Sequence, residues 1–573
     1  MARSFDLVIR GGVVVDGTGG QPFEADVAVA GGRIAAIGKV ADAGAEEIDA
    51  AGKLVTPGFV DIHTHYDGQA VWSQRLSPSS SHGVTTVVGG NCGVGFAPCR
   101  PEHRELLVSV MEGVEDIPEV VMTEGLTWDW ETYPEYLDAI AKRPHDIDFA
   151  SQIPHSAVRV YVMGQRGADR EPATPDDLAR MQAVVREAME VGALGFATSR
   201  LVIHKTGRGD PIPTWQSAES ELEAMALALK DSGRGVLQAV FGESGRTFED
   251  EIDLLSRLTR MSGRPASFSM AQSNERPDTW QGVMRHLALA NESGPRIRAQ
   301  VYPRPIGIVL GFDLSINPFS LCPSYQPLAK LPFEERIKAL RDPQMRARLL
   351  LEDSADAIIP LTRLGRRFEF MYPLGDPPNY EPAPETSIAA MAAARGVDPG
   401  EIAYDLLLEN DGRGMLLVAI ANYGSGSLDP ILSLISDPNA VLGLGDGGAH
   451  YGMICDSSYP TFVLQHWTRD RDGKRLPIER AIKSLAADPA ATVGLNDRGV
   501  LSVGRKADIN VIDHGEVLLP RPEVHYDLPA GGRRLFQGAR GYDATIVSGV
   551  VIAREGQPTG ALPGRLVRGP RDA

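Results

Sequence analysis

The sequence predicts an α/β fold, a (β/α)8 TIM-like barrel accompanied by a small β-sandwich domain built from both termini. Two observations carry this prediction. The middle of the chain alternates short apolar runs with helical stretches, which is the pattern of βα units on a parallel sheet. Both ends consist instead of short apolar runs separated by Gly-rich turns, which is typical of antiparallel β-structure.

The two ends use the same local pattern. Near the N-terminus, DLVIRGGVVVDGTGG and ADVAVAGGRIAAIG each place glycine turns between apolar strands. Near the C-terminus, GVLSVGRKADINVID and DATIVSGVVIAREG repeat the strand–turn–strand form. We therefore expect residues 1–55 and 496–573 to be the two parts of one β-sandwich, with the barrel formed by residues 56–495.

The barrel prediction rests on the number of apolar runs that have the length of a buried strand. Helices are predicted between several of them, for example TPDDLARMQAVVREAMEVG, in which Thr174 is a typical N-terminal cap. Eight βα repeats favour a closed barrel. The eight candidate strands are 54–62, 84–90, 148–154, 192–198, 235–240, 265–272, 296–302 and 441–446.

One long stretch, residues 303–440, interrupts the regular spacing of these strands. It is Pro-rich around 372–384 and contains helical sequences such as TSIAAMAAARG and EIAYDLLLEN. Connections of this length in a compact domain are usually functional. We expect an insertion that lies over one mouth of the barrel as a lid.

Composition excludes several classes of function. The chain has 573 residues, 43% of them hydrophobic, and a net charge of −18. It can bury a large core, and its acidic balance argues against a nucleic-acid or anionic-membrane partner. No run reaches the roughly 18 apolar residues of a membrane span, and the N-terminal segment lacks the apolar core of a signal peptide. Four cysteines do not make a disulfide framework, so a cytoplasmic location is expected.

The strongest chemical signal is PGFVDIHTHYDG, in which His63 and His65 follow an apolar strand. A spacing of two places both side chains on the same face of a strand. At the C-terminal mouth of a barrel that face points inward, where two imidazoles can bind one metal ion. The alternative is a pair of hydrogen-bonded loop histidines, and the context after VTPGFVD favours the metal site.

The run LVTPGFVDIHTHYDGQ resembles the metal-dependent amidohydrolase superfamily, whose first barrel strand ends in this pair of histidines. More narrowly, the chain is similar to the D-aminoacylase branch, the N-acyl-D-amino-acid deacylases. The resemblance covers nearly the whole chain and weakens in 303–440. It is carried further by HGVTTVVGGNCGVGFAP, MEGVEDIP, VGALGFATS, QVYPRP, GLGDGGAHYG and ADPAATVGLNDRGVLSVGRKADINVID.

The resemblance implies a set of site residues. His63 and His65 match the metal ligands of the first strand, and Cys92 in NCGVG matches the metal-binding cysteine of the branch. Asp446 matches the aspartate that binds metal and handles protons. Two imidazoles, a thiolate and a carboxylate also make a plausible zinc site on chemical grounds. By residue type alone, Cys92 could equally be a small buried apolar residue, and Asp446 before Gly447 could belong to a turn.

The sequence also departs from the family pattern. The branch normally carries a histidine at the end of strand five and another after strand six, where this chain has GVLQAVFGE and PASFSMAQSNE. The nearest polar residues, Gln238 and Gln272, are poor zinc ligands. We therefore expect one Zn²⁺ and regard a second site as doubtful. His155, His204 and His450 could replace the missing ligands, or could instead contact the first ligands or the substrate.

These residues lead to hypotheses about the substrate, a small molecule. A nearby donor such as His155 or Tyr302 would polarise the scissile carbonyl. Arginine is the natural partner of a substrate carboxylate, and Arg200 and Arg304 each lie just beyond a barrel strand.

The leading hypothesis for the function is hydrolysis of a linear amide, with N-acyl-D-amino acids as the best substrate class. A metal-activated water would attack the amide, and Asp446 would serve as general base and then as general acid. Two alternatives stay open: hydrolysis of another C–N bond (a cyclic amide, a carbamate or a dipeptide), and a barrel scaffold that has lost catalysis. The oligomeric state is not determined by the sequence.

Overall fold

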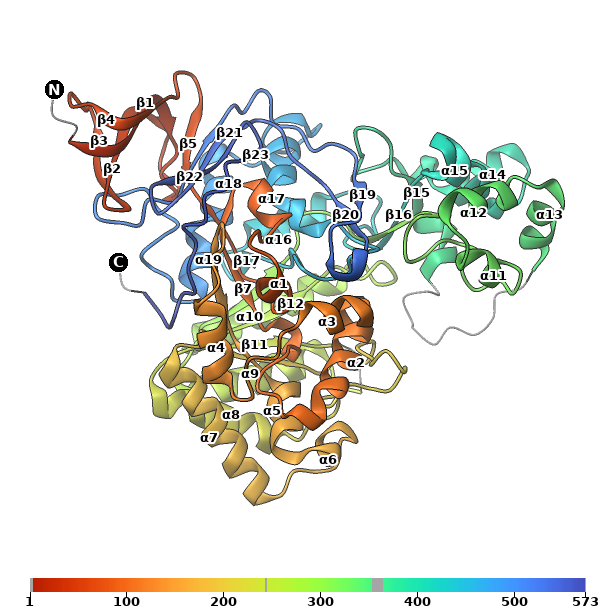
Figure 1. Ribbon diagram of the computed structural model, residues 1–573, viewed down its shortest axis with the longest axis horizontal. Coiled ribbons are helices and arrows are strands. Elements are labelled where there is room, and N and C mark those ends of the chain that lie inside the picture. The colour runs from red at the N-terminus through yellow and green to blue at the C-terminus, as the bar shows by residue number, and fades with distance from the viewer. Residues whose placement is uncertain (1–3, 243–244, 353–363, 572–573) are drawn as a thin grey trace.

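A computed structural model of the chain describes residues 4–242, 245–352 and 364–571. Figure 1 shows three parts. Strands from both termini form a β-domain at the upper left, the barrel with its helices occupies the centre and lower part, and a mainly helical insertion projects to the right.

The β-domain contains one nine-stranded sheet whose strands come from both ends of the chain. Its two parts are joined where β5 pairs antiparallel with β18, so that Val55 lies opposite Val511. Buried aliphatic side chains such as Ile9, Val27 and Ile509 form its core. The prediction of a β-domain built from both termini is confirmed. Its strands are β1 (Phe5–Val14), β2 (Phe23–Ala30), β3 (Arg33–Gly38), β4 (Gly44–Asp49), β5 (Leu54–Pro57), β18 (Ile509–Ile512), β21 (Tyr542–Val547), β22 (Val550–Arg554) and β23 (Gln557–Pro558).

A short hairpin near the C-terminus leaves this sheet and packs on the barrel. It consists of β19 (Glu523–His525) and β20 (Arg534–Phe536). The backbone N–H of Leu535 donates to the carbonyl of Tyr451 at 2.6 Å, and the Arg534 guanidinium donates to the carbonyl of Ser77 at 2.7 Å. Part of the segment 496–573 therefore covers the barrel.

The barrel strands form two parallel sheets, β6-β7-β8 and β9-β10-β11-β12-β13-β17. Strands β8 and β9 follow one another with only Gln152 between them. The ring closes just beyond β17 and β6, where the N–H of Asp446 donates to the carbonyl of His63 at 3.0 Å. The barrel prediction is confirmed. Its strands are β6 (Phe59–Asp61), β7 (Val84–Gly89), β8 (Asp148–Ser151), β9 (Ile153–Pro154), β10 (Gly195–Ser199), β11 (Val236–Val240), β12 (Ala266–Met270), β13 (Ile297–Val301) and β17 (Ala440–Leu442).

Helix α7 (Pro175–Val191) begins and ends where its sequence predicts. In α7, the Thr174 side chain accepts from the N–H of Asp177 in a capping box, and Gly192 ends the helix with φ +108°. No helix among the described residues is long and apolar enough to cross a membrane. The principal helices are α2 (Arg104–Glu115), α3 (Glu119–Gly125), α4 (Tyr133–Ala141), α5 (His155–Met163), α7 (Pro175–Val191), α8 (Glu219–Ser232), α9 (Phe248–Ser262), α10 (Thr279–Glu292), α16 (Asp429–Ser436), α18 (Ile478–Leu485) and α19 (Ala487–Thr492).

The insertion has a hydrophobic core of its own, in which Phe312 and Tyr404 pack edge to face at 5.9 Å. Its antiparallel sheet has the order β14-β16-β15, and the ends of β14 and β16 return to the barrel. The insertion is therefore a folded unit. Its elements are β14 (Ile306–Leu310), α11 (Tyr325–Ala329), α12 (Phe333–Leu340), α13 (Pro343–Leu351), β15 (Met371–Pro373), α14 (Ile388–Arg395), α15 (Pro399–Gly412) and β16 (Leu416–Ala421).

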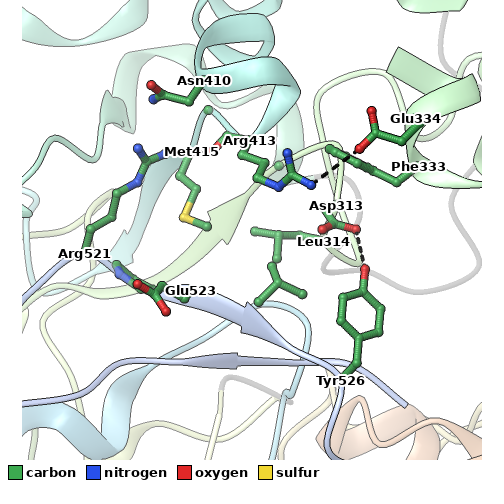
Figure 2. Close-up of a pocket in the computed structure, with 14 residues that line it drawn as sticks. Asp313, Leu314, Phe333, Glu334, Asn410, Arg413, Met415, Arg521, Glu523 and Tyr526 are labelled. Atoms are coloured by element: carbon green, nitrogen blue, oxygen red, sulfur yellow. Dashed lines mark hydrogen bonds and ion pairs between the residues drawn. The ribbon is translucent and has the colours of Figure 1, made fainter. Parts of the chain in front are cut away.

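A cavity of about 480 Å³ lies between the insertion and the C-terminal hairpin (Figure 2). At its rim, the Arg413 guanidinium lies 3.7 Å from the carboxylate of Glu334, and Tyr526 donates a hydrogen bond to Asp313 at 3.0 Å. These charged and polar groups at the rim are therefore paired with one another within the protein. The four predicted metal ligands lie in a different cavity.

Candidate metal centre and active-site cavity

His63 and His65 lie just beyond the end of β6. The N–H of His63 donates to the Asp61 carboxylate at 3.1 Å, which fixes the turn after the strand. Both imidazoles are buried, with their ring centroids 5.6 Å apart, and both line one cavity. The spacing of two thus brings the rings to the same side, as the sequence predicts.

Cys92 reaches these histidines from a left-handed turn after β7. Its φ is +54°, and Gly90 and Gly93 on either side also have positive φ. This turn places the Cys92 Sγ 3.3 Å from His63 Nε2. The ligand atoms of His63, His65 and Cys92 all lie within 4.8 Å of one another, and no other such group occurs among the described residues.

Asp446 completes the cluster from the opposite side of the barrel seam. Strand β17 ends at Leu442, earlier than predicted, because Leu444 and Asp446 adopt φ values of +64° and +47° that no strand accommodates. The turn brings Asp446 Oδ1 to 3.6 Å from His63 Nε2 and 3.7 Å from His65 Nε2. All four residues that the resemblance implies as ligands therefore converge.

The cluster fits a single divalent ion. Asp446 Oδ1 is a buried oxygen without a hydrogen-bond partner among the described residues, and it faces two imidazoles. On the side of the His63 ring that faces away from Asp446, Nδ1 lies 2.7 Å from Gln300 Oε1. The Gln300 amide in turn donates to the Ser267 hydroxyl at 2.9 Å. Nδ1 therefore carries the proton, and the lone pair of Nε2 points toward Cys92 and Asp446. Such an outer hydrogen bond is what orients a metal-binding histidine.

Glu115, at the end of α2, is a site residue that the sequence did not identify. Its Oε1 lies 3.4 Å from His65 Nδ1, and its Oε2 lies 3.6 Å from His450 Nε2. The carboxyl group is buried, and burial raises its pKa to about 7. The segment MEGVEDIP contains it, but an acidic residue on a helix is ordinarily solvated, so its type alone gave no signal.

Without a metal ion, the groups of the cluster and their burial determine which of them carry protons. Burial lowers the pKa of His63 to about 4, so this imidazole is neutral at pH 7. Burial also disfavours the charge on His65, but the Glu115 carboxylate and the contact with Asp446 prevail and raise its pKa well above the usual range. Burial would raise the pKa of Asp446, yet His65 and the neighbouring histidines lower it to about 2. Burial raises the pKa of the Cys92 thiol to about 12, so metal binding must displace its proton.

The cluster lies in a cavity of about 660 Å³. We group its lining residues into two sets, polar and apolar, and call them the two halves of the cavity. One half carries the imidazoles and carboxylates. The other is apolar and includes Ile306 and Ile420 from the insertion, so the insertion supplies part of the wall, in keeping with its predicted place at the mouth. The apolar lining residues are Val114, Leu201, Ile203, Val240, Phe241, Phe248, Met270, Ile306, Ile420 and Leu444.

His204 and His450 both line this cavity. His204 Nδ1 lies 2.8 Å from the Ser199 hydroxyl, which already accepts from the N–H of Leu201 at 3.2 Å. The hydroxyl hydrogen is free to donate to Nδ1, and in that arrangement the proton of the neutral ring is on Nε2. Burial, reinforced by the neighbouring histidines, lowers the pKa of His204 to about 3, so the ring is a neutral donor at pH 7.

His155 and Tyr302 are not among the residues that line the cavity. The His155 ring lies between the Thr198 hydroxyl at 2.9 Å and the Glu221 carboxylate at 2.8 Å, and it is fully buried. The Tyr302 hydroxyl donates to the carbonyl of Asp456 at 2.8 Å. Both side chains are therefore engaged in contacts within the protein.

The two predicted carboxylate-binding arginines also lie outside the cavity wall. The Arg200 guanidinium lies 3.4 Å from the Glu251 carboxylate, and the buried Arg304 pairs with Asp456 at 3.1 Å. Arg276, which sequence reasoning passed over, does line the cavity. It follows β12 in a loop without a recognisable motif.

The ends of strands five and six contribute no imidazole to the cavity among the described residues. Gln238 on β11 is buried outside the wall. Gln272 lines the cavity, but its amide donates to the carbonyl of Pro277 at 3.0 Å and to the Ser425 hydroxyl at 3.1 Å. In the described structure, strands β11 and β12 therefore contribute residues to the cavity wall without an imidazole.

Comparisons with known proteins give matches over most of the chain. The model of the amidohydrolase family Amidohydro_3 matches residues 46–553. An N-acyl-D-glutamate deacylase of Alcaligenes xylosoxydans xylosoxydans is 27% identical over 581 residues, covering 100% of this chain and 98% of the relative. A D-aminoacylase of the same organism is 36% identical over 198 residues, which are 34% of this chain and 38% of the relative.

Solved structures share the fold. A D-aminoacylase superposes with a TM-score of 0.67 at 23% identity, over 99% of this chain and 100% of the other. An N-acyl-D-glutamate deacylase from Bordetella bronchiseptica, solved with zinc and a phosphonate inhibitor, gives a TM-score of 0.65 at 23% identity, over 98% and 99% of the two chains.

Proposed function

This chain belongs to the amidohydrolase family, and from that premise we propose that it hydrolyses the amide bond of an N-acyl-D-amino acid in the cavity around His63, His65 and Asp446. One observation carries the proposal above the others. Side chains from three separate strand ends converge within a few ångströms, inside a cavity large enough for a small amide. The relatives that deacylate N-acyl-D-amino acids supply the substrate class.

We propose that His63, His65, Cys92 and Asp446 hold one zinc ion. Two imidazoles, a thiolate and a carboxylate suit zinc in number and in kind. A bound ion would supply Lewis acidity, which lowers the pKa of water toward neutrality.

Asp446 and His204 would then handle the proton and the carbonyl. The Asp446 carboxylate is ionised at neutral pH. With Oδ1 turned toward the ion, its other oxygen would take the proton of the attacking water and deliver it to the leaving nitrogen. The Nε2–H of His204 is the donor that would polarise the scissile carbonyl. His204 would thus polarise the scissile carbonyl, a role for which the sequence offered His155 and Tyr302 as examples.

The substrate would be bound across the two halves of the cavity. Its carboxylate is assigned to Arg276, because this guanidinium side chain belongs to a residue that lines the cavity. Its acyl group would lie on the apolar half, against Phe241, Ile306 or Ile420.

The test is a substrate panel with a matched catalytic variant. We expect the zinc-loaded chain to release amino acids from N-acyl-D-amino acids, to act poorly on the L-enantiomers and cyclic amides, and to lose activity on His63→Ala substitution. Turnover of only L-substrates or rings would remove the assignment to N-acyl-D-amino acids. No turnover of any C–N bond by the zinc-loaded chain would favour the scaffold hypothesis.

A further inference from the structure

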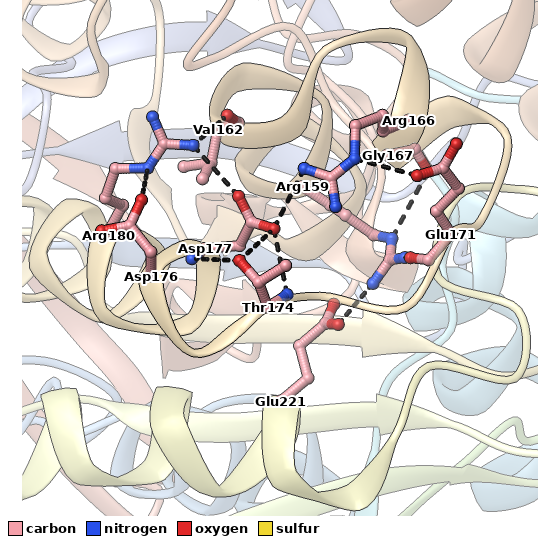
Figure 3. A network of polar contacts seen from close by, with 10 residues as sticks. All are labelled: Arg159, Val162, Arg166, Gly167, Glu171, Thr174, Asp176, Asp177, Arg180 and Glu221. Atoms are coloured by element: carbon pink, nitrogen blue, oxygen red, sulfur yellow. Dashed lines mark hydrogen bonds and ion pairs between the residues drawn. The ribbon is translucent and has the colours of Figure 1, made fainter.

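A chain of buried polar groups runs from the outer helices to the barrel wall near Cys92. It begins at Arg159 on α5, which donates to the carbonyl of Glu171 and to the carboxylate of Glu221 on α8 (Figure 3). The other oxygen of Glu221 lies 2.8 Å from His155 Nε2. Arg159, Glu221 and His155 are all buried, so this carboxylate has its charge balanced inside the protein.

The ionised carboxylate at the centre of this chain sets the orientation of His155. Burial alone would raise the pKa of Glu221, but His155 and Arg159 lower it to about 2, so the carboxylate only accepts. His155 must therefore donate through Nε2. Its other ring nitrogen, Nδ1, lies 2.9 Å from the Thr198 hydroxyl and forms a hydrogen bond with it. Thr198 is thereby held in one orientation.

Thr198 lies directly under the turn that carries Cys92. A Cβ atom at Gly93 would meet the Cα of Thr198 at 2.7 Å and the carbonyl oxygen of Ala197 at 3.0 Å. The backbone of Gly93, whose φ is +64°, thus rests on the end of β10 with no side chain between them. Because Cys92 is the preceding residue and also has positive φ, the position of its thiol depends on where β10 ends.

We propose that His155 is a positioning residue for Cys92: through Thr198 it fixes the end of β10 on which Gly93 rests, and so sets the distance from the Cys92 thiol to His63. His155 does not line the cavity and touches no reacting atom. The inference rests on the metal site of the proposed function. It matters because metal ligands tolerate displacements of only about 0.2 Å.

The test removes one hydroxyl group. Thr198→Val keeps the shape of the side chain but cannot form the hydrogen bond with His155. The readout is titration of the metal-free chain with Co²⁺, whose thiolate-to-metal charge-transfer absorption reports the contact with Cys92. We expect the Co²⁺ affinity to fall about tenfold and this absorption to weaken, since groups outside the ligand set typically change metal affinity by about 10–100-fold. Thr198→Ser restores the hydroxyl and should restore both.

A matched pair elsewhere in the barrel provides the control. His82 Nδ1 and the Thr461 hydroxyl form an equally buried contact of 2.7 Å, outside the cavity wall. Thr461→Val should lower thermal stability to a similar extent and leave the cobalt spectrum unchanged.

The outcomes separate the positioning role from the proposed function. Unchanged cobalt binding in Thr198→Val, or an equal loss in Thr461→Val, would overturn the role of His155. Absence of the thiolate absorption in the unsubstituted chain would also overturn it. A normal cobalt site without any amide hydrolysis would refute the proposed function and leave the positioning role supported.

Discussion

The two halves of the cavity are built in different ways. On the polar half, Cys92, Asp446 and His450 are carried by turns with positive φ after their strands. On the apolar half, Val240 and Met270 are simply the last residues of β11 and β12, in regular strand geometry. Backbone strain of this kind persists only where the surroundings enforce it, and it gathers at reactive sites. Apart from Leu444, whose φ is +64°, the apolar residues do not share this unusual backbone. The comparison indicates that chemistry is concentrated at the turns with positive φ, and specificity on the apolar lining.

The largest effects should come from the polar half. His63→Ala and Asp446→Ala should each lower kcat/KM by about 10³-fold or more, because each removes a predicted ligand and Asp446 also removes the proton carrier. Both variants should remain folded by circular dichroism. His286→Ala, which removes an imidazole paired with Asp253 on the surface, is the control and should retain full activity. Near-normal activity in either cluster variant would place the chemistry elsewhere.

The amount of metal bound per chain tests the same difference between the polar and apolar halves. Because the described ends of β11 and β12 bring no imidazole to the cavity, reconstitution should saturate at one equivalent of zinc per chain. Chelation should lower activity by about 10²-fold or more, and zinc should restore it. Metal analysis alongside the assay measures both. Two tightly bound equivalents of zinc per chain would show that the apolar half of the cavity also binds metal.

The pH dependence of the free energy of unfolding should differ between two carboxylates, one packed behind each half of the cavity. Glu221, behind Cys92, has its pKa lowered from 4.5 to about 2, so its contribution is complete above about pH 4.5 and is lost as the pH falls toward 2. The shift corresponds to about 3 kcal/mol. Burial raises the pKa of Glu251, behind the apolar half, so its protonated form favours the fold and that contribution is lost as the pH rises through its pKa.

Urea unfolding of Glu221→Gln and Glu251→Gln between pH 2 and 6 tests this contrast. Glu221→Gln should flatten the loss of stability at low pH, whereas Glu251→Gln should steepen it. The same pH slope in both variants would contradict the assignment.

The smallest effect is expected on the apolar half. Ile420→Ala should lower kcat/KM for long-chain N-acyl substrates by about tenfold, which corresponds to about 1–2 kcal/mol of lost apolar contact. N-acetyl substrates, which do not reach this wall, are the internal control and should react at the normal rate. An equal loss for both substrates would mean that Ile420 supports the metal centre.

Much of this arrangement follows from local sequence. The alternation of apolar runs and helices predicts the barrel, and the pair His63 and His65 predicts its reactive mouth. The resemblance to the D-aminoacylase branch is confirmed by the family match over residues 46–553 and by the relatives that accompany it. The convergence of Cys92 and Asp446 needed that resemblance, because turns with positive φ leave little trace in residue type.

Other features could not be predicted because they depend on packing between distant segments. Glu115 is an ordinary helical acid until the fold places it against His65. Gln300 is a strand residue whose role appears only when its amide meets His63, 237 positions earlier in the chain. His155 was identified from the sequence, but only its neighbours Thr198 and Glu221 indicate what it does.

The insertion has a core of its own, yet among the described residues it reaches the cavity only through the barrel-proximal ends of β14 and β16. Its contribution to the wall can thus change by exchange of a few aliphatic side chains, without disturbing the seam where Asp446 meets His63. A chain of this design can alter that part of its substrate wall while its hydrolytic chemistry is inherited intact, since the insertion folds around a separate core.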